Sequence, residues 1–177
     1  MAVSGSVVVV PYDPEWSRRF EAERELLESV LAQWLDGGVH HVGSTAIPGI
    51  SAKPLIDMIA GVRDFEETRA AFEPLRAVSY VHTPHRPGIA HHFSKPSPLL
   101  PETEYGLHLT EPGSDLWRER LAFRDALRND PGLATEYEAL KVRLAGEHRH
   151  DLRAYTAGKR DFVTRVLGEF GIQPGRR

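Results

Sequence analysis

The pattern of apolar positions predicts a short strand followed by a long helix at the start of the chain. Val7 to Val10 is a β-branched run, typical of a strand. Asp13 is a suitable N-cap for a helix that begins at Pro14. One face of this helix carries Trp16, Phe20, Leu27, Val30, Leu31 and Trp34. Gly37 and Gly38 are expected to end the helix.

Strand-like runs then follow one another, separated by proline-rich connections. The predicted strands span Val39 to Val42, Leu55 to Val62, Val78 to His82, Ile89 to Ser94 and Tyr105 to Thr110. A helix is expected between the second and third of these strands, because Asp64 and Glu67 have the spacing of a capping box. The prolines between positions 84 and 101 fall in the connections, where no ladder hydrogen bond is needed.

From Ser114 onward the pattern predicts helices only. Ser114 and Asp130 are candidate N-caps for two helices, and a third runs from about Asp151 to Gly168. The predicted fold class is α+β, a mixed or antiparallel sheet with flanking helices and a helical C-terminal third. No internal repeat or linker-like stretch interrupts the chain. We therefore expect a single domain over 1–177, with a sheet-containing core (1–112) and C-terminal helices (113–170).

Composition removes several classes of function. The 177 residues include no cysteine, which excludes disulfides, Cys-ligated metals and thiol nucleophiles. The net charge of −3 gives no basic footprint for nucleic acid or anionic lipid. No apolar run is long enough to cross a bilayer and no secretory signal is present, so a cytoplasmic location is expected. Small polyanions bound in one pocket stay compatible with this composition.

The segment from position 40 to 59 carries the most distinctive chemistry. A predicted strand runs into Gly43 and Ser44, where backbone N–H groups and a hydroxyl can approach a phosphate because glycine has no Cβ. The next strand is apolar except for Asp57. A carboxylate in such a strand is expected to have a metal, a cation or hydrogen-bond donors as its partner. Lys53 is the nearest cation in the sequence, and only four of the 22 basic residues are lysines.

This segment closely resembles the signature of the GrpB family, which belongs to the nucleotidyltransferase-like superfamily. The resemblance covers most of the chain and follows the family order. Its motifs are Tyr12 to Trp16 with Phe20, Gly43 to Asp57, Leu107-His108-Leu109, Phe123-Arg124-Asp125 with Leu127 and Arg128, Tyr137 with Lys141, and Tyr155 with Lys159. The resemblance implies a nucleotidyltransferase-like mixed sheet. In that superfamily a Gly-Ser pair holds the nucleotide phosphates, and three carboxylates on two strands bind two magnesium ions.

The chain departs from this superfamily pattern at the metal-binding positions. The positions two residues before and two residues after Asp57 hold Leu55 and Ile59. Asp57 is therefore a single carboxylate where the superfamily usually has an acidic pair. On the later strand His108 takes the place of a carboxylate, with Glu104 and Glu111 flanking the strand. Ordinary two-magnesium nucleotidyl transfer is therefore in doubt, and the resemblance implies the fold more strongly than the reaction.

A histidine-ligated metal site is the alternative. His41, His92 and His108 with Asp57 are candidate ligands for Zn, Mn or Fe. Side chains alternate along a strand, so at most one member of each adjacent histidine pair can share a face with Asp57. Each candidate also has a purely structural alternative. Gly43 and Ser44 suit a tight turn, Asp57 could anchor the loop, and His108 could be an ordinary sheet histidine.

The sequence leads to three functional hypotheses. The first is a protein that binds a phosphate-bearing small molecule, a nucleotide or a CoA-type ligand, and acts as a metal-dependent nucleotidyl or group transferase. Gly43, Ser44, Thr45, Lys53 and Arg124 would hold the ligand. Asp57 and His108 would be catalytic, and Asp57, His108 and His92 would bind a divalent metal, Mg or Mn before Zn.

The second hypothesis is a non-catalytic ligand-binding module with a degenerate metal site, and the third is a His/Asp metal-dependent hydrolase. The sequence indicates no nucleic-acid or membrane partner, and it does not set an oligomeric state.

Overall fold

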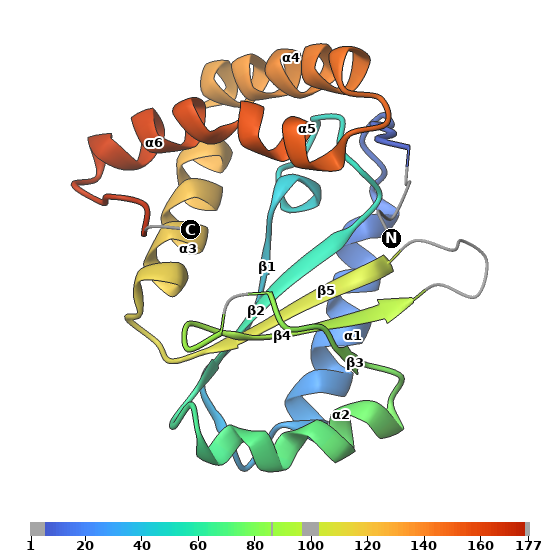
Figure 1. The fold of residues 1–177 in the computed structure, drawn as a ribbon, viewed down its shortest axis with the longest axis vertical. Helices are drawn as coiled ribbons and strands as arrows, with labels where there is room; N and C mark the ends of the chain where they lie inside the picture. Colours follow the sequence, from blue (N-terminus) through green and yellow to red (C-terminus); the bar gives the residue numbers. More distant parts are fainter. Residues whose placement is uncertain (1–5, 86, 97–102, 176–177) are drawn as a thin grey trace.

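A mixed sheet forms the centre of the structure. The computed structural model describes residues 6–85, 87–96 and 103–175. Within these residues five strands form one sheet in the order β1-β2-β5-β4-β3 (Figure 1). The strands are β1 (Leu35–Val42), β2 (Ile56–Val62), β3 (Val81–His82), β4 (His91–Pro96) and β5 (Thr103–Thr110). β2 and β5 are parallel, and the other neighbouring pairs are antiparallel.

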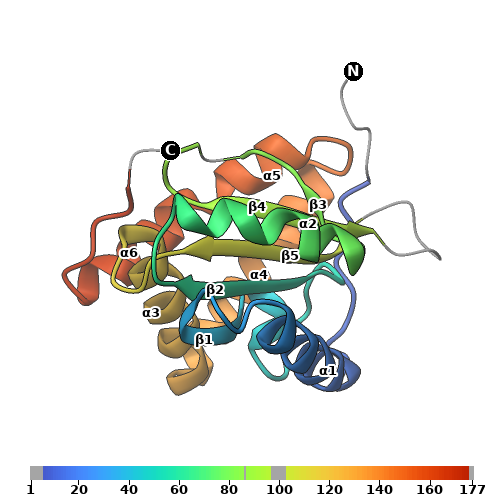
Figure 2. The ribbon, with the colours of Figure 1, turned by 90° about the horizontal axis from the view of Figure 1, so that it is seen from below.

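The first face of the sheet packs on helices from the N-terminal half. These are α1 (Glu15–Val30) and α2 (Phe72–Ala77), the latter preceded by the 3-10 helix η2 (Glu67–Ala71). Alternate residues of β2 and β5 point into this core, among them Met58 and Leu107, because successive side chains on a strand face opposite ways. In Figure 2, α2 lies in front of the strands and the C-terminal helices lie behind them.

A buried charge cluster joins α1 to this face. The Glu23 carboxylate accepts hydrogen bonds from the Tyr80 hydroxyl (2.9 Å) and from the Lys95 ammonium (2.7 Å). Glu23 and Tyr80 are only 6% and 1% exposed. Each polar group in this cluster therefore has a direct partner.

The second face lies toward the C-terminal helices. They are α3 (Asp115–Asn129), α4 (Pro131–Glu147), α5 (Leu152–Gly158) and α6 (Arg160–Glu169). The two predicted N-caps are confirmed, because Ser114 and Asp130 accept hydrogen bonds from the N–H groups of Trp117 and Leu133. Asp151 caps α5 in the same way, since it accepts a hydrogen bond from the Ala154 N–H group. Within the described residues, no helix is both long and apolar enough to cross a membrane.

The predicted last helix is divided in two at Lys159. Thr156 accepts a long 3.4 Å hydrogen bond from the Lys159 amide, which tightens the turn there. A Cβ at Gly158 would lie 2.5 Å from the Leu144 side chain, so α5 approaches α4 more closely than a larger residue permits. The break therefore accompanies a close helix contact that the apolar spacing did not reveal.

Two predicted boundaries near the N-terminus are wrong. Val7 to Val10 is not a strand, and its sheet-like contact is an isolated bridge between Val10 and Ala52. The first helix ends at Val30, and β1 begins at Leu35, before the two glycines that were expected to end the helix. Gly37 and Gly38 have φ of +105° and +77° and lie where the register between β1 and β2 shifts. The two glycines form a β-bulge, which uses glycine at positive φ as the end of a helix does.

Candidate functional site

Asp57 lies near the start of β2, on the face of the sheet turned toward the C-terminal helices. In the sheet register Asp57 is beside Gly106 of β5, and two residues further Ile59 is beside His108. His92 of β4 is directly opposite His108. Side chains at these positions share one face, because the register steps by two. The structure therefore brings together Asp57, His92 and His108, three of the predicted site residues.

Two glycines make room for the Asp57 carboxylate. A Cβ at Gly106 would lie 2.7 Å from Asp57 Oδ1, and a Cβ at Gly43 would lie 3.0 Å from Oδ2. Gly43 also has φ of +73°, which side chains rarely adopt. Gly43 is thus more than a turn residue, because its missing side chain leaves space beside the carboxylate.

The Asp57 carboxylate is partly exposed and faces positive charges from several elements. Within the described residues it takes part in no hydrogen bond and in no ion pair shorter than 4 Å. Burial raises the pKa of the Asp57 carboxyl. The charges that oppose this rise belong, from strongest to weakest, to Arg120, His92, Lys159 and Lys53. They come from α3, β4, the junction of α5 and α6, and the loop before β2.

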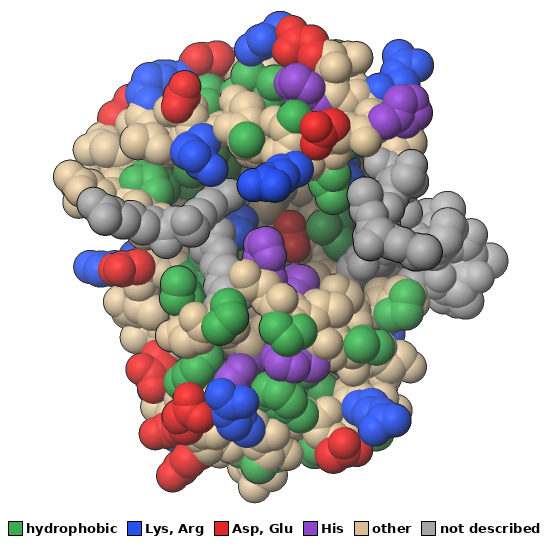
Figure 3. Space-filling view, viewed as in Figure 1, with side chains coloured by type: hydrophobic (Ala, Val, Ile, Leu, Met, Phe, Trp, Pro, Cys, Tyr) green, Lys and Arg blue, Asp and Glu red, His purple; other side chains and the backbone are tan. Residues whose placement is uncertain are grey.

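A hollow in the surface lies between the sheet and the C-terminal helices. Figure 3 shows a carboxylate and histidines at its floor, with Lys or Arg side chains along the helical side. This arrangement matches the charges that act on Asp57. The hollow is the candidate functional site, and we call it the Asp57 cleft.

His92 is held in a defined orientation. Its Nδ1 atom lies 2.7 Å from the Thr83 hydroxyl oxygen and 3.2 Å from the Thr83 carbonyl oxygen. Because a carbonyl can only accept, the tautomer that uses both contacts carries its proton on Nδ1. Burial lowers the pKa of His92, which favours the neutral ring. A lone pair on Nε2 is then available on the side of Gly106 and Asp57.

The loop after β1 is fixed by buried hydrogen bonds. It begins with the 3-10 helix η1 (Ser44–Ala46). The Thr45 hydroxyl donates to the Leu55 carbonyl oxygen (3.0 Å), and its oxygen lies 2.9 Å from His41 Nε2. Thr45, predicted to bind the cofactor, therefore uses its hydroxyl within the protein. Ser44 differs, because within the described residues neither its hydroxyl nor its amide has a partner.

His41 is not part of the Asp57 cleft, so the alternative metal set that included it is wrong. His41 pairs with Met58 in the register and faces the α1 side, where its ring stacks on Phe20 at 4.8 Å. Burial, with Arg128 and Arg124 nearby, lowers the pKa of His41 to about 4. The member of the pair that shares the face of Asp57 is His40, which hydrogen-bonds the Gly37 carbonyl oxygen instead.

Helix α4 anchors the part of the loop that carries Lys53. The Ser51 amide donates to the Glu138 carboxylate (2.6 Å), and the Lys141 ammonium donates to the Ser51 carbonyl oxygen. Lys141 is 1% exposed. Burial, with a further contribution from Lys159, lowers its pKa to about 7. Lys141 therefore fixes the loop backbone from the side of α4, and its ammonium is bound to the loop instead of pointing into the cleft.

Arg124, predicted to bind the cofactor, is not among the four strongest charges that act on Asp57. Its guanidinium donates to the His41 carbonyl oxygen (3.1 Å) and pairs with Asp125 (2.8 Å). Together with Arg128 it lines a cavity of about 500 Å³ between α1 and α3. The helix places Arg124 toward the edge of β1, so its role is to join α3 to that strand.

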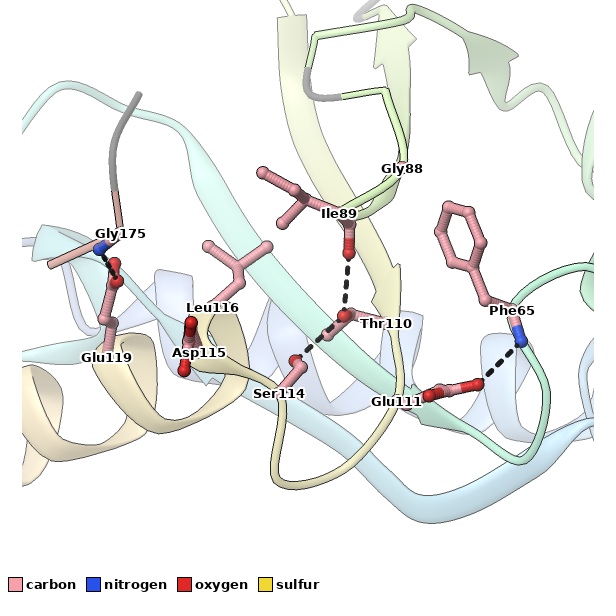
Figure 4. A pocket seen from close by; sticks show the side chains of 10 residues that line it. All are labelled: Phe65, Gly88, Ile89, Thr110, Glu111, Ser114, Asp115, Leu116, Glu119 and Gly175. Carbon is pink, nitrogen blue, oxygen red and sulfur yellow. Dashed lines mark hydrogen bonds between the residues drawn. The ribbon is translucent and has the colours of Figure 1, made fainter.

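A cavity of about 400 Å³ lies at the far end of β5 and contains none of the predicted site residues (Figure 4). Its wall includes the carboxylates of Glu111, Asp115 and Glu119. Glu111 accepts a hydrogen bond from the Phe65 amide (3.1 Å). This acidic wall opposes binding of a phosphate, so this cavity is a poorer candidate for a phosphate site than the Asp57 cleft.

The donors in the Asp57 cleft do not fit the two-magnesium site of the superfamily. Next to Asp57 on the same face stand Val42, Ile59 and Gly106, none of which offers a carboxylate. Across the described ranges, no three His, Asp or Glu side chains are arranged to hold a metal ion. Asp57, His92 and His108 share a face, but they do not form a three-ligand centre.

Arg120 is the residue that sequence reasoning missed. It is not among the predicted site residues, yet it has the strongest opposing effect on the Asp57 pKa. The available signal was its spacing: Arg120 lies four residues after Leu116 and three before Phe123, both on the inward side of α3.

Comparison with known proteins identifies the family. A family model described as "GrpB protein" matches residues 6–169. The Glutamate-rich protein GrpB of Alkalihalophilus pseudofirmus is 36% identical over 169 residues, covering 93% of this chain and 96% of that protein. The crystal structure of conserved protein GrpB from Enterococcus faecalis is 26% identical with a TM-score of 0.81, covering 93% of this chain and 99% of that chain.

A more distant likeness concerns the fold alone. The structure of the GLD-2/RNP-8 complex matches with a TM-score of 0.55 at 11% identity, covering 86% of this chain and 60% of that chain. The predicted nucleotidyltransferase-like mixed sheet with flanking helices is thereby confirmed. By the family match over most of its length, the chain belongs to the GrpB family.

Proposed function

We propose that the Asp57 cleft binds a phosphate-bearing small molecule, of the nucleotide or CoA type. The observation that carries the proposal is the convergence of Arg120, Lys159 and Lys53 on a hollow whose floor holds one carboxylate. Because like charges repel, cations from separate elements are gathered around a cleft only at a free-energy cost. An anionic ligand offsets that cost by adding charge-assisted hydrogen bonds.

The residues of the loop before β2 would contact the phosphate. Ser44 offers a hydroxyl and an amide that have no partner within the described residues. Lys53 precedes Pro54, which holds the backbone at Lys53 extended. An ammonium in this place is a point charge that a planar guanidinium does not reproduce.

A nucleotidyl or other group transferase is the second candidate function. It is supported by the nucleotidyltransferase-like fold and by His92, whose Nε2 lone pair faces the cleft beside Asp57 and would act as a general base. The predicted catalytic role of His108 belongs to this candidate, since its ring lies 4.5 Å from that of His92. The missing carboxylates favour the binding function over catalysis.

Thermal unfolding with ATP, CTP, GTP, UTP and CoA tests the proposal, because a ligand that binds only the folded state raises Tm. Each ligand is tested in EDTA and with Mg²⁺ or Mn²⁺. A Tm increase with any of them in either condition supports the proposal, and no increase with all of them contradicts it. Metal analysis of the purified protein tests the third hypothesis, since a His/Asp metal hydrolase would contain stoichiometric Zn or Mn.

Variants of Lys53 locate the binding site. Lys53→Ala is expected to weaken binding of the most stabilising of these ligands by about 1.5–3 kcal/mol, the usual range for a hydrogen bond to a charged group. Lys53→Arg is expected to weaken it as well, because its geometry differs. Arg160→Ala is the control, an exposed cation outside the charges that act on Asp57. Equal affinity of Lys53→Ala and the parent would place the ligand elsewhere.

A further inference from the structure

We infer that the Asp57 cleft holds its phosphate group without a divalent metal ion, because Arg120, with Lys53 and Lys159, supplies the positive charge that metal ions supply elsewhere in the superfamily. This inference rests on the proposed function and goes further, since it names the binding chemistry and assigns Arg120 to the ligand. Three features of the cleft support it: the position of the Asp57 carboxylate, the position of Arg120, and the charges of the side chains around them.

Among its described side chains, the sheet offers a metal ion too few oxygen ligands. Magnesium is bound in proteins mainly through carboxylates and phosphates in octahedral geometry. On the face of Asp57, the neighbouring strand positions carry Val42, Gly106 and Ile59, and beyond them the two histidines at 92 and 108. Among the side chains that the structure describes, Asp57 is the one carboxylate at these positions, and it faces three basic side chains whose charges repel a divalent cation.

Arg120 lies on the inward stripe of α3. Leu116, Phe123 and Leu127 are four residues before, three after and seven after it, so all four side chains project from one side of the helix. Leu116 and Leu127 are each 1% exposed. Arg120 thus occupies a position of the kind that an apolar residue usually fills, and its guanidinium faces the sheet side instead of open solvent.

In the part of the chain that the structure describes, no carboxylate forms an ion pair with this guanidinium. Within the described residues, Arg120 is half-buried and takes part in no hydrogen bond or ion pair. Arg118, two residues earlier on the outer side, is exposed and pairs with Asp115 at 2.6 Å. A half-buried arginine without a partner is unfavourable unless an anion binds to it. Its planar fork also suits two oxygens of one phosphate.

The charge balance supports direct phosphate binding. Arg120, Lys53 and Lys159 come from three different elements and act on one carboxylate, so basic side chains surround the cleft before any ion enters. In the two-magnesium sites of the superfamily, three carboxylates around two magnesium ions leave an excess of positive charge. The two arrangements therefore present the same sign of charge to a phosphate, and only the second depends on metal ions.

Calorimetric titration of the full chain with ATP and with inorganic pyrophosphate tests the inference. We expect binding in EDTA, with Kd changed less than about threefold when Mg²⁺ is added. In EDTA, Arg120→Ala is expected to weaken binding about tenfold or more, and Arg118→Ala, the matched control on the same helix, to leave Kd unchanged. If Arg120→Ala does not fold, Arg120→Gln keeps most of the stem and is expected to show the same loss.

The outcomes separate this inference from the proposed function. Binding that requires Mg²⁺ or Mn²⁺ overturns the inference and leaves the proposed function standing. Binding in EDTA that is as tight in Arg120→Ala and Arg120→Gln as in the parent overturns it too, because the guanidinium then does not contact the phosphate. If ATP, pyrophosphate and CoA bind under neither condition, the proposed function fails and the inference fails with it.

Discussion

The two faces of the sheet treat buried charge in opposite ways. On the α1 side, the Glu23 carboxylate receives the Tyr80 hydroxyl and the Lys95 ammonium at 2.9 and 2.7 Å. On the side of the C-terminal helices, the Asp57 carboxylate has no direct partner within the described residues, although several cations act on it from a distance. Glu23 is buried and Asp57 is partly buried, yet within the described residues only Glu23 has hydrogen-bond donors as partners.

The difference separates a structural role from a candidate functional one. A satisfied buried ion cluster fixes how a helix docks, and removing one partner is strongly destabilising. A charge that the fold leaves without a partner lowers stability and persists where a ligand uses it. Removing the charge of Glu23 should therefore lower the free energy of unfolding, whereas removing the charge of Asp57 should leave it unchanged or raise it. Single substitutions on the two faces test this difference.

The largest expected effect is on the α1 side. Glu23→Ala leaves the Tyr80 hydroxyl and the Lys95 ammonium without their acceptor, and should lower the free energy of unfolding by about 3 kcal/mol. Urea denaturation measures this loss. Glu21→Ala on the same helix is the control, since its exposed pair with Arg24 contributes less than about 1 kcal/mol. Equal losses in the two variants would contradict a structural role for the cluster.

The second prediction concerns Lys141, a buried charge on the side of the C-terminal helices. Its pKa is lowered to about 7 in the folded protein, so between pH 7 and its ordinary pKa of 10.5 the unfolded chain binds more protons. The destabilising effect of the charge is full below pH 7 and fades as pH rises. Relative to Lys141→Met, the parent should gain about 2 to 3 kcal/mol of unfolding free energy from about pH 6 to about pH 9.

Urea denaturation of the parent and of Lys141→Met at several pH values measures this change, and groups that titrate alike in both proteins cancel in the difference. A stability difference that stays constant across this range would show that the ammonium is not desolvated by its burial.

The third prediction concerns the space beside Asp57. Gly106→Ala would bring a Cβ to 2.7 Å from Asp57 Oδ1 and should lower the free energy of unfolding by about 2 kcal/mol. In an Asp57→Ala background much of this loss should disappear, because the clashing carboxylate is gone. The double-mutant cycle is measured by urea denaturation. Gly146→Ala is the control, since a Cβ there meets no atom within 4 Å and the helix should gain slightly in stability.

The smallest expected effect is that of Asp57→Asn. The pKa of Asp57 is raised in the folded protein, so its contribution to stability is present below about pH 4, the ordinary carboxyl range, and is lost as pH rises through the raised value. Near pH 7, Asp57→Asn should therefore be as stable as the parent or more stable by up to about 1 kcal/mol. A loss like that of Glu23→Ala would show that Asp57 is a structural anchor of the loop.

The secondary structure and the order of its elements were largely predictable from local patterns. The N-caps Ser114 and Asp130 were found because their chemistry acts over three residues of sequence. Gly37 and Gly38 misled the prediction, because positive φ serves a strand bulge as well as a helix end. The break at Lys159 was missed, since it accompanies contact between Gly158 and Leu144 on another helix.

The candidate site was only partly predictable. Asp57 was identified because one carboxylate in an apolar strand needs an explanation, and alternation along strands limited the histidines to one from each pair. Alternation alone does not tell whether His40 or His41 shares the face of Asp57, because that depends on the register between β1 and β2. Arg124 was favoured over Arg120 by motif resemblance, although only about 40° of rotation around α3 separates the residue at the edge of β1 from the one facing the cleft.

Residue types and short spacings are sufficient to identify the family, the α+β class and a lone carboxylate after a Gly-Ser turn. The side chains that share the face of Asp57, and the cations that surround it, follow from the tertiary structure alone. Register between strands and the rotation of a packed helix arise from contacts between segments far apart in the chain, such as β2 with β5 and α3 with the sheet. Electrostatic balance in the cleft depends on those long-range placements and has no local signature in the sequence.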